Sequence, residues 1–240
     1  MDRDSINREI TIRRYGEIDV LRATAIILMI LFHLVYDLRE FAGVNIDYRS
    51  PFWFVIGRTS ALLFIFISGL SSGFARSPGR RGLKVLFFGM VITFVTYLFL
   101  KDEYVRFGIL HLLGVAMLLS PLLLRLSSWM LGMLAALSAI LGFWFKKQVL
   151  AMPFLLPFGL VYDGLTTIDY YPLFPYLAVT ILGVLVYRHC YARRKEPLFS
   201  FHLKSEPIKW LSRNSLAVYL VHQPLLLFFI FLIIRLRLLS

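Results

Sequence analysis

The sequence has one cysteine and few charged residues, and both scarcities limit what the protein can be. Cys190 alone excludes an intrachain disulfide framework and a cysteine-based metal cluster. Charged residues make up 17% of the 240 positions, against about 25% in ordinary soluble domains. Hydrophobic residues make up 59%, against about 45–50%. This composition predicts an all-α, polytopic bundle of membrane-spanning helices.

Long apolar runs place the expected helices, because about 20 such residues are needed to cross the hydrocarbon core. Seven segments meet this requirement, and they are Ile18–Leu38, Phe52–Ala75, Leu83–Leu100, Val105–Leu124, Trp129–Phe145, Leu173–Tyr187 and Ser215–Ile234. An eighth run, Val149–Tyr162, is short and contains two prolines, so it could be re-entrant or part of an extra span. We expect a polar N-terminal segment at residues 1–17 and a single transmembrane domain at residues 18–236.

Acidic residues are scarce as well, with 14 against 26 lysines and arginines, which gives a net charge of +12. The positive residues lie mainly in the segments between the apolar runs, as expected for the loops of a membrane protein. The positive charge therefore does not indicate a nucleic-acid partner. With seven spans, sixteen positive residues fall on the side of the N-terminus and eight on the other side. The positive-inside rule then predicts a cytoplasmic N-terminus, and we expect the protein in the cytoplasmic (inner) membrane of a bacterium.

The first apolar run carries four ionisable residues: Asp19, Arg22, His33 and Asp37. Successive helical residues rotate by about 100°, which places all four within about a sixth of the helix circumference. Such a stripe must face protein or a water-filled cavity, because a charge in lipid costs several kcal/mol. Arg22 and His33 are roughly 16 Å apart along the axis. Arg22 is therefore expected on the cytoplasmic side and His33 in the outer half.

Each residue of the stripe has a structural and a functional interpretation. Asp19 and Arg22 could pair with each other at the start of the helix. His33 could be a hydrogen-bonded core histidine, or it could act in catalysis or proton handling. Asp37, one turn further on, could orient the His33 imidazole or lie exposed at the membrane surface.

Other polar residues in the apolar runs are candidates for lining a cavity, namely Arg58, His111, Ser215, Tyr219 and His222. The small residues of "SGLSSG" are expected to let helices pack closely. Asp163, Asp169 and the stretch Tyr170–Pro175 form an expected outer loop, which could carry acceptor-binding carboxylates or only a rigid turn. The five histidines have no metal-ligand spacing, so no metal is expected.

Five stretches together resemble a known family: "IDVLRATAIILMILFHLVYDL", "FIFISGLSSG", "RFGILHLLG", "YYPLFPYLAVTILGVLVYR" and "RNSLAVYLVHQPLLL". They are similar to bacterial transmembrane acyltransferases that resemble the catalytic part of heparan-α-glucosaminide N-acetyltransferase. The ten residues between Arg22 and His33 also match the spacing of an acyltransferase-3 signature. The resemblance extends from Ile18 to Leu227.

The resemblance implies transfer of an acyl group from cytoplasmic acetyl-CoA or another acyl-CoA to a sugar or glycan amine or hydroxyl on the far side. It implies catalytic roles for Arg22 and His33, with Asp37 beside the histidine. His33 could be a general base on the acceptor or take the acyl group itself. CoA phosphates would meet basic residues near the cytoplasmic side. Those residues are Arg22, Arg76, Arg80, Arg81 and Lys84.

The sequence departs from the family pattern in two places. Ala23 replaces the glycine that usually follows the Leu-Arg pair in the family. The loop Arg39–Ser50 lacks the catalytic histidine that heparan-α-glucosaminide N-acetyltransferase, a lysosomal enzyme, has in the loop after this helix. Two other functions therefore stay open: a small proton-coupled transporter, or a non-catalytic subunit of a larger membrane complex. Membrane lipids are expected partners, and the chain could form a homo-oligomer or join such a complex.

Overall fold

The computed structural model describes residues 15–150, 152–193 and 205–239, and within these ranges the chain is helical without strands. Six helices of the described residues are long and apolar enough to cross a membrane, and a seventh apolar helix, Ile109–Arg125, is shorter. The predicted all-α polytopic bundle is confirmed. Most of the predicted N-terminal segment, residues 1–14, lies outside the described residues.

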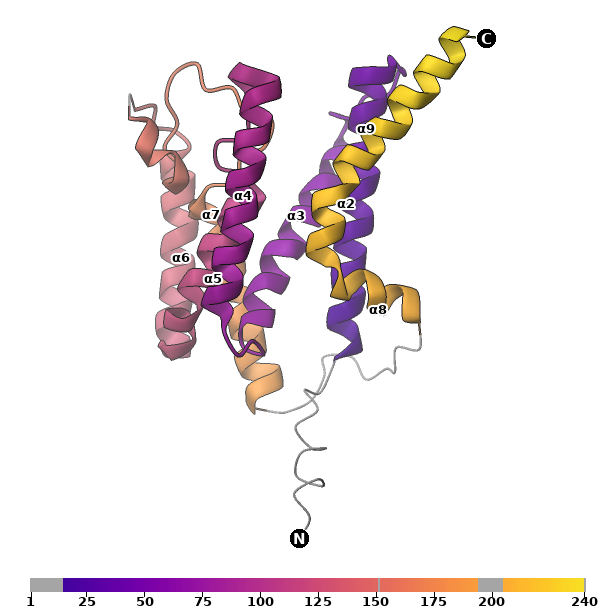
Figure 1. Ribbon diagram of the computed structural model, residues 1–240. Helices are drawn as coiled ribbons and strands as arrows, with labels where there is room; N and C mark the ends of the chain where they lie inside the picture. The colour runs from indigo at the N-terminus through magenta and orange to yellow at the C-terminus, as the bar shows by residue number, and fades with distance from the viewer. Residues whose placement is uncertain (1–14, 151, 194–204, 240) are drawn as a thin grey trace.

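The long helices alternate in direction along the chain (Figure 1). They are α2 (Gly16–Ala42), α3 (Pro51–Ser72), α4 (Pro78–Leu100), α5 (Ile109–Arg125), α6 (Ser128–Phe145), α7 (Leu173–Val186) and α9 (Ser215–Leu239). We call the end of the bundle where α2 begins the proximal end, and the opposite end the distal end. The short helix α8 (Glu206–Arg213) lies across the proximal end, just before α9 begins.

Local sequence signals explain several helix boundaries. Gly43 ends α2 in the left-handed conformation, at φ 65°, which glycine adopts without steric cost. Pro51 and Pro78 begin α3 and α4, where the missing N–H has no intrahelical partner to lose. The hydroxyl of Ser127 accepts a hydrogen bond from the backbone N–H of Met130 and so caps α6.

Two distal segments differ from their predicted structure. The predicted span Val105–Leu124 becomes helical only at Ile109, because residues 105–108 form no helix and Phe107 pairs with Tyr170 in an isolated bridge. The run Val149–Tyr162 is not an extra span, since its described residues form the short 3-10 helix η2 (Pro153–Phe158). A bridge between Val149 and Val161 closes this segment on itself.

The polar stretch between α7 and α9 contains helix that the hydropathy pattern does not predict. Helix α7 continues as a π-helical segment, η3 (Tyr187–Arg193), and α8 follows after residues that lie outside the description. Proline and a glutamate open α8, as is common in a first helical turn. This helix brings polar side chains back toward α2.

Helix α3 occupies the centre of the bundle and packs against α2, α5 and α7. A Cβ on Gly69 of α3 would lie 2.0 Å from the carbonyl oxygen of Thr180, and a Cβ on Gly183 of α7 would lie 2.2 Å from that of Phe66. Only glycine fits at these two contacts, so the α3 and α7 backbones touch. Small residues commonly permit such close approach in membranes.

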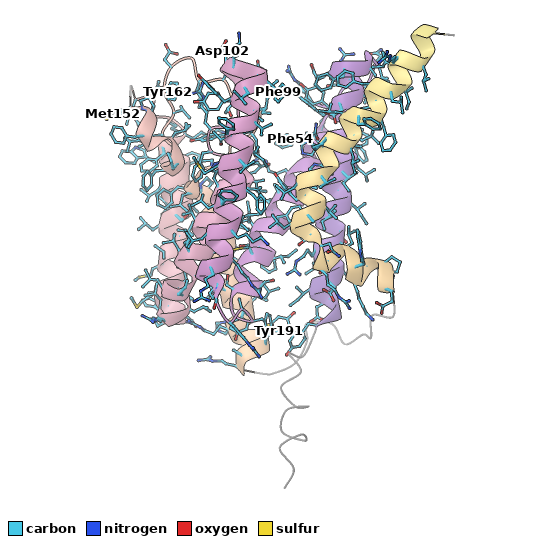
Figure 2. All side chains as sticks on the ribbon, viewed as in Figure 1. Phe54, Phe99, Asp102, Met152, Tyr162 and Tyr191 are labelled. Atoms are coloured by element: carbon cyan, nitrogen blue, oxygen red, sulfur yellow. The ribbon has the colours of Figure 1, made fainter. Side chains whose placement is uncertain are left out.

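The outer faces of α4 and α9 are apolar and exposed. On α4, Phe94 is 63% and Phe99 81% exposed, and on α9 Phe228 is 59% exposed. Figure 2 places Phe99 near the distal end of α4, with Asp102 just beyond it at that end. Apolar faces of this extent are rare on soluble monomers and expected where helices meet lipid. The protein is an integral membrane protein.

Candidate active site

The polar stripe of α2 is divided into two clusters that involve helices from the far end of the chain. We call Asp19, Arg22, Ser71 and Ser212 the proximal cluster, and His33, Asp37, His222 and Gln223 the distal cluster. Both carboxylates are buried, with Asp19 5% and Asp37 0% exposed. The stripe therefore faces protein, as its rotation predicts.

The proximal cluster joins α2, α3 and α8 through hydrogen bonds. Arg22 donates from Nη2 to Ser71 Oγ at 2.8 Å and from Nη1 to Ser212 Oγ at 3.1 Å. Ser212 in turn donates to Asp19 Oδ1 at 2.6 Å. One turn earlier, the hydroxyl of Tyr191 donates to Glu17 Oε1 at 2.9 Å. These contacts fix the orientation of the Arg22 guanidinium.

The basic residues expected near CoA phosphates lie at the same end of the bundle as Arg22. The loop after α3 and the first turns of α4 carry them, and α3 also carries Ser71, which binds Arg22. All four are exposed: Arg76, Arg80, Arg81 and Lys84. The proximal end thus presents four exposed positive side chains in addition to the Arg22 guanidinium, which is fixed by hydrogen bonds.

The distal cluster joins α2 to α9. The rings of His33 and His222 lie edge to face, with centroids 5.0 Å apart. The side-chain nitrogen of Gln223 donates to both carboxylate oxygens of Asp37, at 2.8 and 3.0 Å. Sequence reasoning missed Gln223, although a glutamine next to a histidine within a spanning helix is a usable signal.

Two buried polar atoms of the distal cluster have no hydrogen-bond partner among the described residues. They are Nε2 of His222 and Oε1 of Gln223. His222 is only 8% exposed. Buried polar atoms are bonded in the great majority of cases, so each exception calls for an explanation.

His111 lies elsewhere, at the start of α5, where both ring nitrogens have partners. Its Nδ1 accepts from the backbone N–H of Gly108 at 3.2 Å, and its Nε2 lies 3.2 Å from the hydroxyl of Thr93. His111, Asp169 and Tyr219 line a small cavity between α4, α5 and α9. Tyr219 also contacts the ring of His222, at 5.6 Å.

The distal loop before α7 is held in place by its polar residues. Asp169 accepts a hydrogen bond from the backbone N–H of Ile109 at 2.9 Å, and burial raises the pKa of this carboxyl to about 6. The hydroxyl of Tyr170 donates to the carbonyl of Leu156, and burial raises its pKa to about 12. Asp163 is exposed. Asp169 therefore caps the start of α5. Of the two alternatives for this loop, a rigid turn or acceptor-binding carboxylates, this contact fits the rigid turn.

Arg58 and Ser215 contact neither cluster through a hydrogen bond that the structure shows. Arg58 donates to the hydroxyl of Tyr176 and lies 5.4 Å from the ring of Phe54 and 5.9 Å from that of Tyr171. It links α3 to α7 through aromatic contacts. Ser215 is the first residue of α9 and is half-buried.

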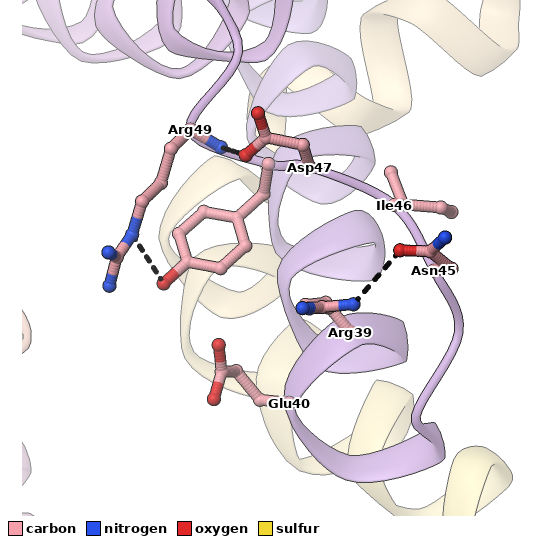
Figure 3. Close-up of a pocket in the computed structure, with 7 residues that line it drawn as sticks. Arg39, Glu40, Asn45, Ile46, Asp47 and Arg49 are labelled. Atoms are coloured by element: carbon pink, nitrogen blue, oxygen red, sulfur yellow. Dashed lines mark hydrogen bonds between the residues drawn. The ribbon is translucent and has the colours of Figure 1, made fainter.

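A polar cavity of about 330 Å³ opens in the loop that follows α2, about one turn beyond Asp37 (Figure 3). This volume is at the lower end of the range for ligand sites, about 300–1,000 Å³. Arg39 donates to Asn45 at 3.3 Å, and the backbone N–H of Arg49 donates to Asp47 at 2.9 Å. Seven residues line the cavity: Arg39, Glu40, Asn45, Ile46, Asp47, Tyr48 and Arg49.

Both clusters and this cavity lie within the part of the chain that one family model matches. The family model described as "Heparan-alpha-glucosaminide N-acetyltransferase, catalytic" matches residues 14–224. The chain belongs to this family. No curated protein and no solved structure matches the chain. The match to the heparan-alpha-glucosaminide N-acetyltransferase catalytic domain begins before Asp19 and ends one residue after Gln223, so it includes every member of both clusters.

Membership in the heparan-alpha-glucosaminide N-acetyltransferase family makes the protein a membrane acyltransferase. Acetyltransferases of this type use acetyl-CoA as the donor. The imidazole of His33, with the buried carboxylate of Asp37 one helical turn away, is suited to acid–base or nucleophilic work in such a transfer. In the described residues no three histidine, cysteine, aspartate or glutamate side chains gather as a metal site would require.

Proposed function

We propose that the protein is a membrane-embedded acetyltransferase that moves an acetyl group from cytoplasmic acetyl-CoA to an amine or hydroxyl of a sugar or envelope glycan. One observation carries the proposal. A single face of α2 presents an oriented guanidinium, Arg22, and, roughly 16 Å further along the axis, His33, with the buried carboxylate of Asp37 one helical turn beyond it. That separation lets one extended donor bind at one end and react at the other.

The proximal cluster is the proposed binding site for the CoA phosphates. Guanidinium groups match phosphate oxygens with two parallel hydrogen bonds, and Arg22 is already held by Ser71 and Ser212. The exposed residues Arg76, Arg80, Arg81 and Lys84 add positive charge at the same end. The positive-inside rule assigns this end to the cytoplasm, and in a bacterium to the inner face of the inner membrane.

The distal cluster is the proposed site of the transfer. The acceptor forms a bond to the acetyl carbonyl carbon, the carbon–sulfur bond breaks, and the acceptor's proton passes to an imidazole and then to the CoA thiolate. His33 acts in this step as the base or by taking the acetyl group first. The buried Asp37 carboxylate is fixed by Gln223 and lies one helical turn from His33, so its charge favours an imidazolium at that position.

The cavity beyond α2 is the proposed entry site of the acceptor. It combines Arg39 and Arg49 with Glu40 and Asp47, so it offers partners both for an amine and for anionic groups of a glycan. The apolar faces of α4 and α9 are left to membrane lipids, or to a second copy or a larger complex.

Acetyl transfer in proteoliposomes tests the proposal, with radiolabelled acetyl-CoA as donor and glucosamine as acceptor. We expect His33→Ala to lower the rate by about 100-fold or more, the usual contribution of an acid–base group. The matched control is His189→Ala, because His189 is exposed and lies near the opposite end of the bundle in η3. A His33→Ala protein as active as the parent would rule out this site. Glucosamine uptake without acetyl-CoA consumption would favour a transporter.

A further inference from the structure

We infer that α8 is an interfacial helix whose outer face binds acidic phospholipids of the leaflet at the proximal end, through Trp210 and Arg213. The inner face of the same helix carries Ser212, which binds Arg22, so the lipid contact also holds the donor site in place. This link to the donor site rests on the proposed function, whereas the lipid contact itself does not. The position of α8, the side chains on its two faces and the charge around it carry the inference.

Helix α8 lies beside α2 at the depth where the apolar part of α2 begins. Ser212 of α8 donates to Asp19 at 2.6 Å and accepts from Arg22 at 3.1 Å. Both residues follow shortly after Gly16, where α2 begins, and the helical rise places them roughly 5 to 9 Å along the axis. In Figure 1, α8 projects sideways from the bundle, and α2 begins below it in the view. A helix in this position meets the boundary between lipid headgroups and hydrocarbon.

The two faces of α8 differ in burial. Ser212 is 1% exposed, whereas Trp210, two positions earlier and therefore about 200° away around the helix, is 60% exposed. Arg213 is also exposed and lies three positions after Trp210, on the same face. The Trp210 ring thus points away from Arg22 and does not extend the proposed binding site of the donor. An exposed tryptophan and a basic residue are typical of a helix that lies in the headgroup region.

The four tryptophans of the chain are divided equally between the two ends of the bundle. Trp53 lies in the first turn of α3 and Trp144 in the last turn of α6, both at the distal end. Trp129 lies in the first turn of α6, at the same end as Trp210, and is 75% exposed. Tryptophans gather at the two interfaces of a membrane because their rings are amphipathic. Trp210 therefore belongs to the aromatic belt of the proximal interface.

The charge of the described proximal surface suits an acidic partner. On α8, Lys209 Nζ donates to Glu206 Oε1 at 2.7 Å, so the acidic residue of this helix is paired and Arg213 determines the charge of the outer face. Basic residues next to a spanning helix attract the acidic phospholipids of the cytoplasmic leaflet, the leaflet that the positive-inside rule assigns to this end. The other exposed basic residues at this end are Arg76, Arg80, Arg81, Lys84, Arg125 and Arg193.

Tryptophan fluorescence of the whole chain in nanodiscs tests the lipid contact. A variant with Trp53→Phe, Trp129→Phe and Trp144→Phe keeps Trp210 as its only tryptophan. We expect phospholipids brominated near the headgroup to quench its emission more strongly than those brominated near the chain ends. The difference in emission between the parent and Trp210→Phe measures the same quenching with the other three tryptophans in place.

The preference for acidic lipid is measured in the same nanodiscs, with a minor fraction of brominated phosphatidylglycerol or of brominated phosphatidylcholine. We expect phosphatidylglycerol to be enriched next to Trp210 by about 5-fold, the attraction that one arginine near an acidic surface provides. Arg213→Gln should remove this enrichment. Arg125→Gln is the matched control and should retain it, because Arg125 is exposed at the same end but lies on α5.

Initial rates of acetyl transfer test the link to the donor site. We expect Trp210→Ala to raise the KM for acetyl-CoA by about 3-fold with kcat retained, because a less firmly held Ser212 weakens its hydrogen bond to Arg22 without removing it. Trp129→Ala is the matched control and should leave both constants unchanged, since Trp129 is exposed at the same end but lies on α6.

Each result supports or overturns one part of the inference. Trp210 emission that neither brominated lipid quenches would place the outer face in water or against another protein, and it would overturn the lipid contact. Quenching by acetyl-CoA in place of lipid would assign the ring to the adenine of the donor and overturn it as well. Lipid quenching with an unchanged KM in Trp210→Ala overturns only the link to the donor site. A parent that transfers no acetyl group overturns the proposed function, and the fluorescence still decides the lipid contact.

Discussion

The proximal and distal clusters use the same elements in opposite ways. Each combines two ionisable residues of α2, one of them a buried carboxylate, with side chains from the last two helices. In the proximal cluster Ser212 accepts from Arg22 and donates to Asp19, so its hydroxyl is used in both directions. In the distal cluster His222 and Gln223 each leave a buried polar atom without a partner among the described residues.

This difference suits the proximal cluster to binding the donor and the distal cluster to the transfer reaction. A guanidinium that is already oriented loses little freedom when it binds phosphate, so a satisfied network at the proximal end favours affinity. An unpaired polar atom in a low-dielectric interior is costly until a substrate pairs with it, so the distal end favours a specific reacting group. Substitutions in the distal cluster should therefore affect the rate, and those in the proximal cluster should affect the KM for acetyl-CoA.

The largest expected effect comes from removing the distal charge. Asp37→Asn keeps the size of the side chain but cannot stabilise an imidazolium, so we expect kcat to fall by about 100-fold or more with little change in the KM for acetyl-CoA. Transfer to glucosamine at saturating acetyl-CoA measures this. Asp163→Asn is the control, since Asp163 is exposed in a loop. An unchanged kcat would show that Asp37 only supports the packing of α2 against α9.

The division into clusters also shows how far the sequence predicts the site. Helical rotation correctly predicts that Asp19, Arg22, His33 and Asp37 share one protein-facing side of α2, because the 100° step depends only on local geometry. The partners of this face come from residues up to 193 positions away, such as Ser212, and no local pattern indicates them. Helix α8 was missed because it is short and polar.

The fold was more predictable than its distal loops. In lipid, a spanning segment must satisfy its backbone hydrogen bonds within itself, so a long apolar run predicts a helix. Six of the predicted spans agree with long apolar helices of the structure. The start of α5 was misplaced because Phe107 pairs with Tyr170, a contact across 63 residues that hydropathy does not detect. The role of His111 as a helix-capping residue depends on the same local fold.

A smaller effect is expected from loosening the proximal cluster. Ser212→Ala removes the hydroxyl that accepts from Arg22 and donates to Asp19, so the guanidinium loses one of its supports. We expect the KM for acetyl-CoA to rise by about 5- to 10-fold with kcat retained, the effect of losing one hydrogen bond of this kind. Initial rates over a range of acetyl-CoA concentrations measure both constants.

Ser138→Ala is the matched control for Ser212→Ala. Ser138 is also fully buried, but its hydroxyl donates to the carbonyl of Pro175 on α7, away from Arg22. A fall in kcat without a change in KM for Ser212→Ala would contradict the assignment of the proximal cluster to donor binding.

The smallest expected effect concerns Asp169, a carboxylate outside both clusters that is held by one backbone N–H. Burial raises its pKa from 3.8 to about 6, so the folded protein binds this proton more tightly than the unfolded chain does. The free energy of unfolding therefore falls as the pH rises from about 4 to about 6, because the buried carboxyl loses its proton over this interval. Below about pH 4 the group causes no loss of stability, and above about pH 6 the loss is complete.

Asp169→Asn keeps an oxygen that can accept from Ile109 and removes the charge. The variant should unfold at the same temperature as the parent near pH 4 and several degrees higher near pH 8, with acetyl transfer unchanged. Thermal unfolding in detergent at the two pH values measures this difference. A parent that gains stability relative to the variant as the pH rises would mean that the carboxylate is stabilised when ionised. Asp169 would then resemble Asp37, whose oxygens both accept hydrogen bonds, more closely than its single backbone contact indicates.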